Sequence, residues 1–293
     1  MRIFITTLLF ALITSALGQV KFRIEQNLPY CVEGKTDSLR QLNLVIPYGV
    51  QLNPLLIWIG GGAWSYVDRH VEMDMAKKLA QEGIAVATIG HRLSPATWKD
   101  PTLNSGIKHP THAEDIASAV AWLVANAPKY SLDTSQLFIG GFSSGAHLAT
   151  LVAWDHSFLS KHGLKAHHLF KGILPFSGAY DIQQYYDVIA QSDRPELAAS
   201  HVEAVFGKDH DLFEIASPVT YMKNAHAPML VFCDEGLYSY THLLQEALRA
   251  IDFQSVTFIY VPLGHGALWR SLSFNQNSIY REHMVQFIRD QSR

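Results

Sequence analysis

The chain has no marked excess of charge of either sign. Its 293 residues include 23 Lys and Arg against 26 Asp and Glu, which gives a formal net charge of −3. Proteins that bind nucleic acid through bulk electrostatics carry a basic excess that displaces counterions, so this composition argues against that class. Little net charge combined with 48% hydrophobic residues also excludes a mainly disordered chain.

Cysteines and long apolar runs are also scarce. Two cysteines, Cys31 and Cys233, are too few for a disulfide framework. Whether they pair stays open, although Cys233 ends an apolar strand-like run, which favours a buried free thiol there. The single long apolar run lies at the N-terminus, and this excludes a polytopic membrane protein.

Residues 1–18 have the composition of a secretory signal peptide. Arg2 supplies a positive start, a short apolar stretch follows, and the small residues Ala16 and Gly18 precede Gln19. The apolar stretch is shorter than the ~20 residues that cross a bilayer. We therefore predict cleavage near Gly18 and Gln19 and a secreted or periplasmic mature chain without stable membrane insertion; an uncleaved anchor is the alternative.

Apolar periodicity predicts strands that alternate with helices along the rest of the chain. The predicted strands are residues 42–46, 55–62, 84–89, 137–140, 170–176, 229–233 and 256–261, and the predicted helices are residues 71–81, 111–126, 145–154, 195–206, 241–251 and 278–289. Such alternation is typical of an α/β fold with a mostly parallel central sheet flanked by helices. No linker divides residues 19–293, so we predict one domain, with residues 179–227 as a small cap-like insertion.

The helix predicted at 111–126 has recognisable sequence signals at its two ends. Thr111 and Glu114 have the spacing of a capping box, and Pro128 is expected just beyond the end of the helix. The loop at 91–110 before it has a length that is often functional. Asp115 is a candidate brace for that loop; the alternative is an exposed helical acid.

The sharpest local motif is a G-x-S-x-G sequence from Gly141 to Gly145, centred on Ser143. It lies between a predicted strand and a predicted helix, where a tight turn needs small residues because the backbone is crowded. Such a turn lifts the serine hydroxyl above the sheet, at the N-terminus of the helix. We predict that Ser143 is a nucleophile; the alternative is a serine that only caps the helix.

A serine nucleophile needs a base, and His265 follows the last predicted strand. It lies between Gly264 and Gly266, so the sequence predicts a loop that projects the imidazole toward Ser143. Because its pKa is near neutrality, histidine can take the hydroxyl proton and return it to a leaving group. The alternative is an ordinary surface histidine.

Three glycines, Gly60 to Gly62, end the buried run at 55–62 and precede Ala63. Glycine allows backbone N–H groups to face a cleft, where they can bind a developing negative oxygen. The expected donors of this oxyanion site are the N–H groups of Gly62, Ala63 and Ser144. The alternative is a plain flexible turn.

Several motifs taken together resemble a known family. They are IWIGGGAW at 57–64, HRLSP at 91–95, HPTHAEDIASAVAWL at 109–123, IGGFSSGAHLA at 139–149, LPFSGAYDI at 174–182 and VPLGHG at 261–266. In this order and spacing the chain resembles α/β-hydrolase carboxylesterases of the hormone-sensitive-lipase-like and kynurenine-formamidase-like types. The resemblance implies an α/β-hydrolase fold, with a small insertion over the active site, and a hydrolase activity without a defined substrate.

Two positions depart from the family pattern. Gly60 stands where the family has a histidine that shapes the oxyanion loop, and His91 stands where the family has a tyrosine. The backbone donors of the oxyanion loop survive the first change, although we expect a more flexible loop.

The resemblance also implies an acid partner for His265, after the strand at 229–233. Counts from the two sides of this loop differ, and a shortened loop reconciles them at Asp234, with Glu235 as second choice and Asp181 as third. The acid of such a triad holds the histidine tautomer and stabilises the imidazolium. The alternative for Asp234 and Glu235 is a solvated pair of loop acids.

No metal site and no organic cofactor are predicted. Four histidines lie near one another in sequence, but no spacing among them matches a helical zinc pair, so they are expected to be exposed loop residues. They are His156, His162, His167 and His168.

Together these observations predict a secreted serine carboxylic-ester hydrolase with a Ser-His-Asp/Glu triad and an acyl-enzyme. Its small-molecule substrate is expected to be a short-acyl or aryl ester, because no large apolar lid is evident. Trp64, Phe142 and Trp269 are candidates to line its pocket. The alternatives are an arylformamidase-like amidohydrolase or a peptidase with the same machinery, and a non-catalytic binding protein that retains the fold. The oligomeric state is not predicted.

Overall fold

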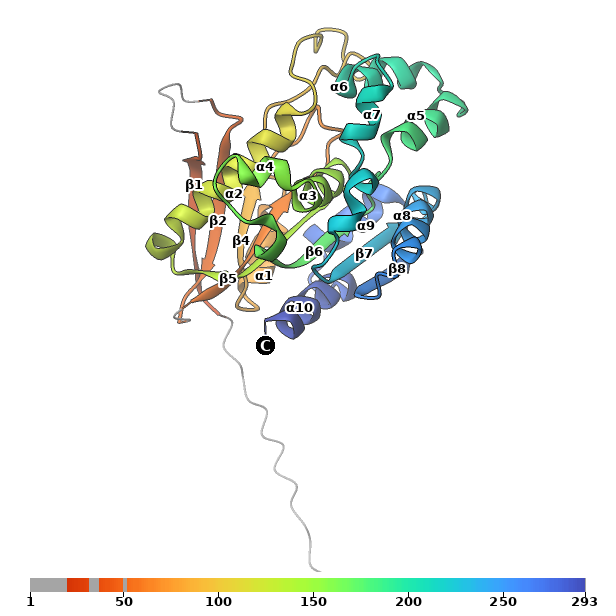
Figure 1. The fold of residues 1–293 in the computed structure, drawn as a ribbon. Coiled ribbons are helices and arrows are strands. Elements are labelled where there is room, and N and C mark those ends of the chain that lie inside the picture. The colour runs from red at the N-terminus through yellow and green to blue at the C-terminus, as the bar shows by residue number, and fades with distance from the viewer. Residues whose placement is uncertain (1–19, 32–36, 50–51, 293) are drawn as a thin grey trace, which may run out of the picture.

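The computed structural model describes residues 20–31, 37–49 and 52–292, and the predicted signal peptide at 1–18 lies outside them. The described strands form one sheet in the spatial order β1-β2-β4-β3-β5-β6-β7-β8 (Figure 1). β2 pairs antiparallel with both β1 and β4, and all pairs from β4 to β8 are parallel. The sheet is therefore mostly parallel, as the sequence predicts.

Each predicted strand has a counterpart in the sheet. The strands are β1 (Phe22–Pro29), β2 (Gln41–Pro47), β3 (Asn53–Ile59), β4 (Ala85–Ile89), β5 (Leu132–Phe142), β6 (Phe170–Phe176), β7 (Met229–Asp234) and β8 (Val256–Val261). β1 was not expected from the sequence. It is an edge strand with a largely polar, half-exposed sequence, so it lacks the apolar run that marks the buried strands.

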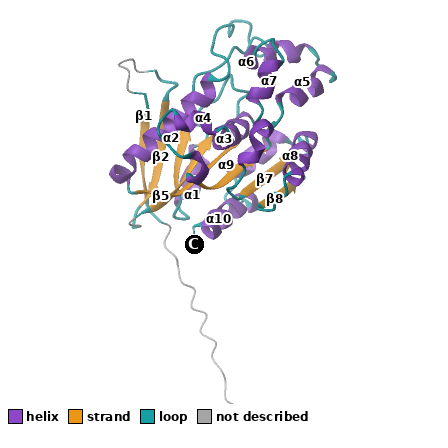
Figure 2. Cartoon of the chain, viewed as in Figure 1, coloured by secondary structure: helices purple, strands orange, loops and turns teal. Residues whose placement is uncertain are grey.

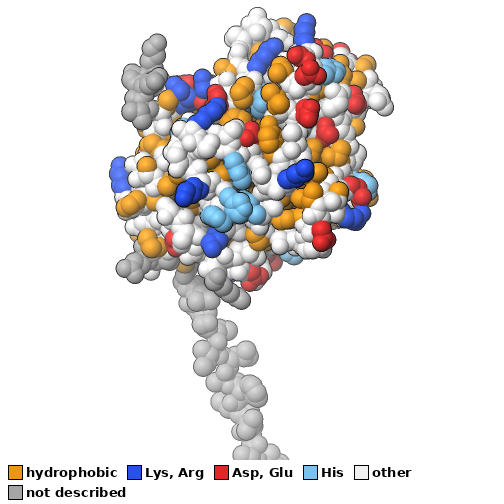
Figure 3. Space-filling view, in the orientation of Figure 1, with side chains coloured by type: hydrophobic (Ala, Val, Ile, Leu, Met, Phe, Trp, Pro, Cys, Tyr) orange, Lys and Arg blue, Asp and Glu red, His pale blue; other side chains and the backbone are white. Residues whose placement is uncertain are grey.

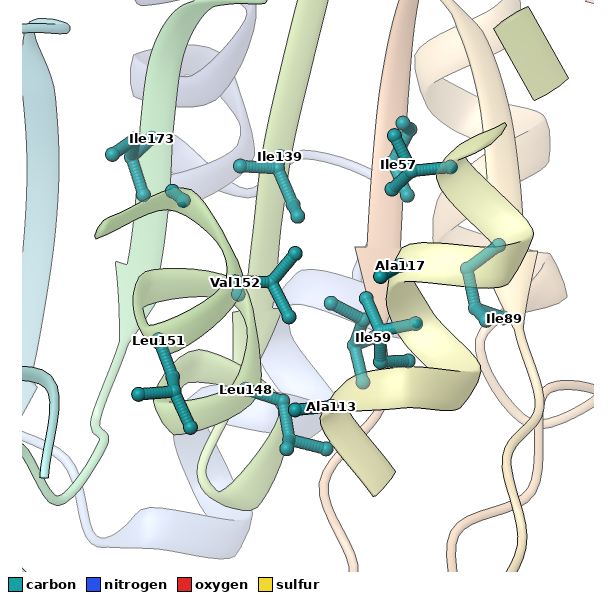
Figure 4. Packing of buried hydrophobic residues seen from close by; sticks show 14 of the residues in the cluster. Ile57, Ile59, Ile89, Ala113, Ala117, Ile139, Leu148, Leu151, Val152 and Ile173 are labelled. Atoms are coloured by element: carbon teal, nitrogen blue, oxygen red, sulfur yellow. The ribbon is translucent and has the colours of Figure 1, made fainter. Parts of the chain in front are cut away.

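Helices cover both faces of the sheet (Figure 2). The first face is covered by α2 (Thr111–Tyr130), α3 (Ser144–Trp154) and α8 (Tyr238–Ala250), and the second by α1 (Met73–Ala80), α9 (His265–Ser273) and α10 (Ile279–Gln291). β3 shows why both layers form. Ile57 and Ile59 share a core cluster with Ala117 of α2 and Leu148 of α3 on the first face (Figure 4), whereas Leu56 and Trp58 belong to the core cluster on the second face.

Residues 179–227 are more helical than the sequence suggests. They contain α5 (Ile182–Ala190), the π-helix η2 (Ala198–Glu203), α6 (Ala204–Phe206), α7 (Asp211–Ala216) and the 3-10 helix η3 (Pro218–Asn224). The single helix predicted at 195–206 is therefore divided between η2 and α6. α5 packs on the core with an apolar face, whereas the shorter helices are held by burial of a few apolar side chains, including Val202, Phe206 and Phe213.

The ends of two helices differ from the predictions. Thr111 is the first residue of α2 rather than its cap, because Pro110 holds the N-cap position and no side-chain cap forms. Pro128 lies inside α2, in its last turns, where its missing N–H removes one helical hydrogen bond and its φ still suits a helix. His265 begins α9, so the expected loop around it is shorter than predicted.

Two further short helices lie between β5 and β6, namely α4 (His156–Ser160) and the 3-10 helix η1 (Ala166–His168). None of the helices within the described ranges combines the length and the apolar character that a membrane crossing requires. Cys31 and Cys233 are both free thiols, and Cys233 is buried as the sequence favours.

Candidate active site

Ser143 occupies the sharp turn between β5 and α3. Its backbone has φ 56° and ψ −119°, which is a strained conformation for a residue with a side chain. The Ser143 N–H donates to the Phe176 carbonyl at 2.8 Å, and the Ser143 carbonyl accepts from the first turn of α3. Neighbouring structure therefore fixes the serine in a conformation that an isolated turn would avoid.

The two motif glycines are required by the closeness of β3. A Cβ atom at Gly145 would overlap the Ile59 carbonyl oxygen, and one at Gly141 would lie 2.6 Å from the same atom. Any side chain at either position would push α3 away from the end of β3. The G-x-S-x-G pattern thus reflects a close backbone crossing beneath Ser143.

His265 and Asp234 form a hydrogen-bonded pair. His265 Nδ1 lies 2.6 Å from Asp234 Oδ2, and the other carboxylate oxygen accepts from the Gly236 N–H at 2.9 Å. The Asp234 side chain is fully buried, whereas that of His265 is 40% exposed. Burial alone raises the pKa of the Asp234 carboxyl, but hydrogen bonds from His265, Ser177 and Gly236 outweigh burial and lower it overall.

The other two candidate acids lie elsewhere. Glu235 is exposed, and its backbone N–H donates to the Leu263 carbonyl. Asp181 caps α5 by accepting from the Gln184 N–H at 3.0 Å. Of the three acids considered from the sequence, Asp234 is therefore the one whose carboxylate contacts His265.

Ser143 and His265 line the same cavity, which has a volume of about 310 Å³. Within the described residues no hydrogen bond joins the Ser143 hydroxyl to the imidazole; in unliganded sites such contacts are often longer than in the reacting complex. The His265 ring packs against the Phe142 ring, with 4.6 Å between their centroids. The imidazole is therefore held from one side by Asp234 and from another by the residue before the serine.

The predicted oxyanion donors lie on both sides of Ser143. Gly62 and Ala63 have positive φ values, and Ala63 and Ser144 line the cavity that contains the serine. In the described part of the chain, the N–H groups of Gly62, Ala63 and Ser144 donate to no protein acceptor. They remain free to bind a substrate oxygen.

Gly61 is a site residue that the sequence analysis did not single out. A Cβ atom there would lie 3.2 Å from the Ser143 Cβ and 3.1 Å from the Phe142 ring, so the glycine lets the loop after β3 approach the serine. Together with Gly62 it lines a second cavity of about 310 Å³, which also reaches Ser143 and His265. The run of three glycines was the signal that could have identified it.

Ser177 is a second residue that sequence reasoning missed. It follows β6, is fully buried and has φ 54°. Its N–H donates to the Phe232 carbonyl at 2.7 Å, and its hydroxyl accepts from the Asp234 N–H at 3.3 Å. Ser177 therefore links the end of β6 to the acid at the end of β7.

Aromatic side chains form much of the first cavity wall. They are Trp64, Tyr66, Trp98, Tyr185 and Tyr240, with His201 beside them. Burial lowers the pKa of His201 to about 4, so its ring is neutral at physiological pH. Of the aromatic residues proposed from the sequence, Trp64 lines this cavity, whereas Phe142 and Trp269 line the second one.

Asp115 braces the start of the loop at 91–110. Its carboxylate forms a 2.6 Å ion pair with the Arg92 guanidinium and also accepts from the Arg92 N–H at 3.0 Å. The Asp115 side chain is almost fully buried. This loop therefore leaves β4 in a fixed direction.

Four histidines gather on the protein surface away from Ser143, and Figure 3 shows such a group near the middle of one face. They are His156, His167, His168 and His226. The rings of His167 and His226 are stacked, with 4.2 Å between centroids. His162, which the sequence suggested as a neighbour, lies against Ser118 instead. Across the described ranges, no group of three metal-ligating side chains has an arrangement that could hold a metal ion.

Comparison with known families matches residues 42–236 to the model of the family BD-FAE. Among curated proteins, esterase LipQ of Mycobacterium tuberculosis is 25% identical over 222 residues, which cover 73% of this chain and 50% of LipQ. Kynurenine formamidase-like hydrolase fscH of Fusarium equiseti is 25% identical over 300 residues, covering 90% of this chain and 95% of fscH. The chain spans about half the length of LipQ and of two further mycobacterial relatives.

Solved structures show the same architecture. Esterase B from Lactobacillus rhamnosis superposes with a TM-score of 0.76 at 21% identity, covering 92% of this chain and 87% of that protein. This likeness confirms the predicted α/β-hydrolase fold. The relatives named as an esterase and as a kynurenine formamidase-like hydrolase confirm the resemblance drawn from the motifs.

Proposed function

Because this chain belongs to the BD-FAE family, we propose that it is a serine hydrolase that cleaves carboxylic esters. Relatives named as esterases support this activity. The observation that carries the proposal is the arrangement of Ser143, on a strained turn, in one cavity with His265, whose Nδ1 contacts the buried Asp234.

The first half of the proposed reaction forms an acyl-enzyme. His265 Nε2 accepts the Ser143 hydroxyl proton while Oγ bonds to the ester carbonyl carbon. The carbonyl oxygen gains the negative charge and accepts hydrogen bonds from the N–H groups of Gly62, Ala63 and Ser144. The tetrahedral species then expels the alkoxide, which takes the proton from the imidazolium and leaves as the alcohol.

The second half repeats the chemistry with water. His265 accepts a proton from water, the hydroxide bonds to the acyl carbon, and Ser143 Oγ leaves with the proton that His265 returns. Asp234 stays ionised throughout and stabilises the imidazolium through its 2.6 Å contact. The proposed cycle consumes an ester and water, yields an acid and an alcohol, and needs neither metal nor organic cofactor.

We propose that the substrates are short-acyl or aryl esters and that the protein is exported and meets them outside the cytoplasm. The aromatic cavity of about 310 Å³ suits a compact group more than a long chain. The signal-peptide composition of residues 1–18 supports a secreted or periplasmic location.

An amidohydrolase is the second candidate. It is favoured by fscH, which matches most of this chain, and by a kynurenine formamidase of Salmo salar that is 26% identical over 160 residues. The same nucleophile, base and oxyanion donors would cleave an aryl formamide. Which activity dominates therefore depends on how fast the protein cleaves a formamide relative to an ester.

The test compares hydrolysis of p-nitrophenyl acetate, p-nitrophenyl butyrate and N-formylaniline. We expect ester turnover by wild type and background rates for Ser143→Ala and His265→Ala, while the exposed-residue controls Ser160→Ala and His162→Ala keep wild-type rates. Faster cleavage of the formamide would favour the amidohydrolase. Equal background rates for wild type and both site variants would contradict catalysis and favour a binding protein.

A further inference from the structure

Glu72 is a buried carboxylate outside the proposed triad. Glu72 is 1% exposed. It occupies the N-cap position of α1, but its side chain makes no capping hydrogen bond. It lines the second cavity beside Ser143 and His265. Burying a carboxylate is unfavourable unless its oxygens are satisfied, so its contacts indicate why it is there.

Both carboxylate oxygens of Glu72 accept indole N–H groups. Oε2 accepts from Trp58 Nε1 at 2.9 Å, and Oε1 accepts from Trp269 Nε1 at 3.1 Å. Trp58 lies in β3, two residues before the glycine loop, and Trp269 lies in α9, the helix that His265 begins. One side chain therefore ties the strand that leads to the oxyanion loop to the helix that carries the base.

Glu72 also fills the space beside the first glycine of the loop. A Cβ atom at Gly60 would lie 3.0 Å from Glu72 Oε1, 3.1 Å from its Cγ and 3.3 Å from its Cδ. The carboxylate cannot move aside cheaply, because two indoles hold it. Gly60 and Glu72 are thus a matched pair, in which the absence of a side chain at one position accommodates the carboxylate of the other.

Burial, two indole donors and one nearby acid act on the pKa of the Glu72 carboxyl. Burial raises the pKa of its carboxyl, the indole donors Trp58 and Trp269 lower it, nearby Asp68 raises it, and the net direction is upward. A buried acid of this kind stabilises a fold less than an apolar residue of similar volume would. Its contacts instead orient the two elements that meet at Ser143.

We propose that Glu72 is a positioning residue for catalysis, which fixes the oxyanion loop through Gly60 and Trp58 and fixes His265 through Trp269. This inference rests on the proposed hydrolase function. Glu72 itself does not contact the substrate in this proposal. It acts on the reaction through the oxyanion loop and through α9. Loss of the carboxylate should therefore lower kcat more than it raises KM, because misplaced donors and base weaken transition-state binding.

The first test is Glu72→Gln, which has one acceptor oxygen and must turn an amide NH2 toward the other indole. We expect kcat for p-nitrophenyl acetate, per active site titrated with a fluorophosphonate, to fall about tenfold or more, because small misplacements at an active site are costly. KM should stay within about threefold. Trp269→Phe removes the indole donor of one of these two hydrogen bonds, and it should likewise lower kcat while KM stays nearly unchanged. The matched control Asp74→Asn, a partly exposed acid on α1, should match wild type.

The second test is a double-mutant cycle. Gly60→Ala should lower kcat strongly in wild type but much less in Glu72→Ala, because the second change frees the space that the new Cβ needs. Additive effects, or a Glu72→Gln variant with wild-type kcat and KM, would overturn the inference. Failure of the proposed function is separate: wild type would then resist the fluorophosphonate and show no Ser143-dependent turnover.

Discussion

Replacing Asp234 by Asn tests the proposed triad at its most specific contact. The carboxylate uses one oxygen for His265 Nδ1 at 2.6 Å and the other for the Gly236 N–H at 2.9 Å. An amide has one acceptor oxygen. Because the backbone N–H can only donate, the oxygen should turn to Gly236 and the NH2 group to His265.

This arrangement selects the wrong imidazole tautomer. His265 Nδ1 must then accept from the introduced side-chain amide, so the ring proton moves to Nε2, where it faces Ser143 and blocks proton transfer from the hydroxyl. The imidazolium also loses its charged partner. Together we expect a fall in kcat of about 10³- to 10⁴-fold, or about 4–5.5 kcal/mol of transition-state stabilisation at ~1.4 kcal/mol per tenfold.

The assay is steady-state hydrolysis of p-nitrophenyl acetate across pH 5 to 9, with Glu235→Gln and Asp181→Asn as matched controls that keep wild-type kcat. An Asp234→Asn variant with more than a tenth of wild-type kcat would refute the assignment, as would a larger loss in either control. Stability gives a second readout. Because the pKa of Asp234 is lowered in the fold, wild type loses this contribution as pH falls through that pKa, and the variant should lose less.

Three other perturbations test the surrounding structure. Gly145→Ala forces a Cβ into the Ile59 carbonyl, so the free energy of unfolding in urea should fall by about 2 kcal/mol or more. Asp115→Asn breaks a pair that is buried on the Asp115 side and one-third exposed at Arg92, and should lower the thermal midpoint by the equivalent of about 2 kcal/mol, less than a fully buried pair. Burial and three neighbouring imidazoles lower the pKa of His226, so the fold binds fewer protons than the unfolded chain and loses stability below about pH 6.5. His226→Gln should flatten that loss between pH 7.5 and 5.5 in urea titrations.

The parts of the fold that the sequence predicts best are those that one local pattern determines. The buried parallel strands carry continuous apolar runs, because helices cover both of their faces, and each predicted run has a strand. Ser143 was recognisable because a close crossing with β3 demands glycine at both Gly141 and Gly145. His265 follows from chain order in a fold that brings the ends of parallel strands to one edge.

Other features depend on contacts between distant segments and leave little local signal. Ser177 looks like an ordinary loop serine, and its role comes from lying between the ends of β6 and β7. In the sequence Glu72 resembles a solvent-exposed acid of a helix. Only the structure shows that the indoles of Trp58 and Trp269, from two other elements, enclose it. In 179–227 only α5 carries a helical apolar period, at Ile182, Tyr185, Tyr186 and Ile189; the other helices there are too short to show one.

The order of strands in the sheet also determines when this protein can act during folding. The proposed oxyanion loop follows β3, the proposed nucleophile Ser143 follows β5, the proposed acid Asp234 ends β7 and the proposed base His265 begins the helix after β8. During synthesis the Ser143 turn can form before Asp234 and His265 have been made. During refolding both residues are present, but the Ser143 turn can form before the last strands bring them to it. Ester turnover should therefore reappear after most helical signal in a refolding experiment, and it reports closure of the C-terminal edge of the sheet rather than local order around the serine.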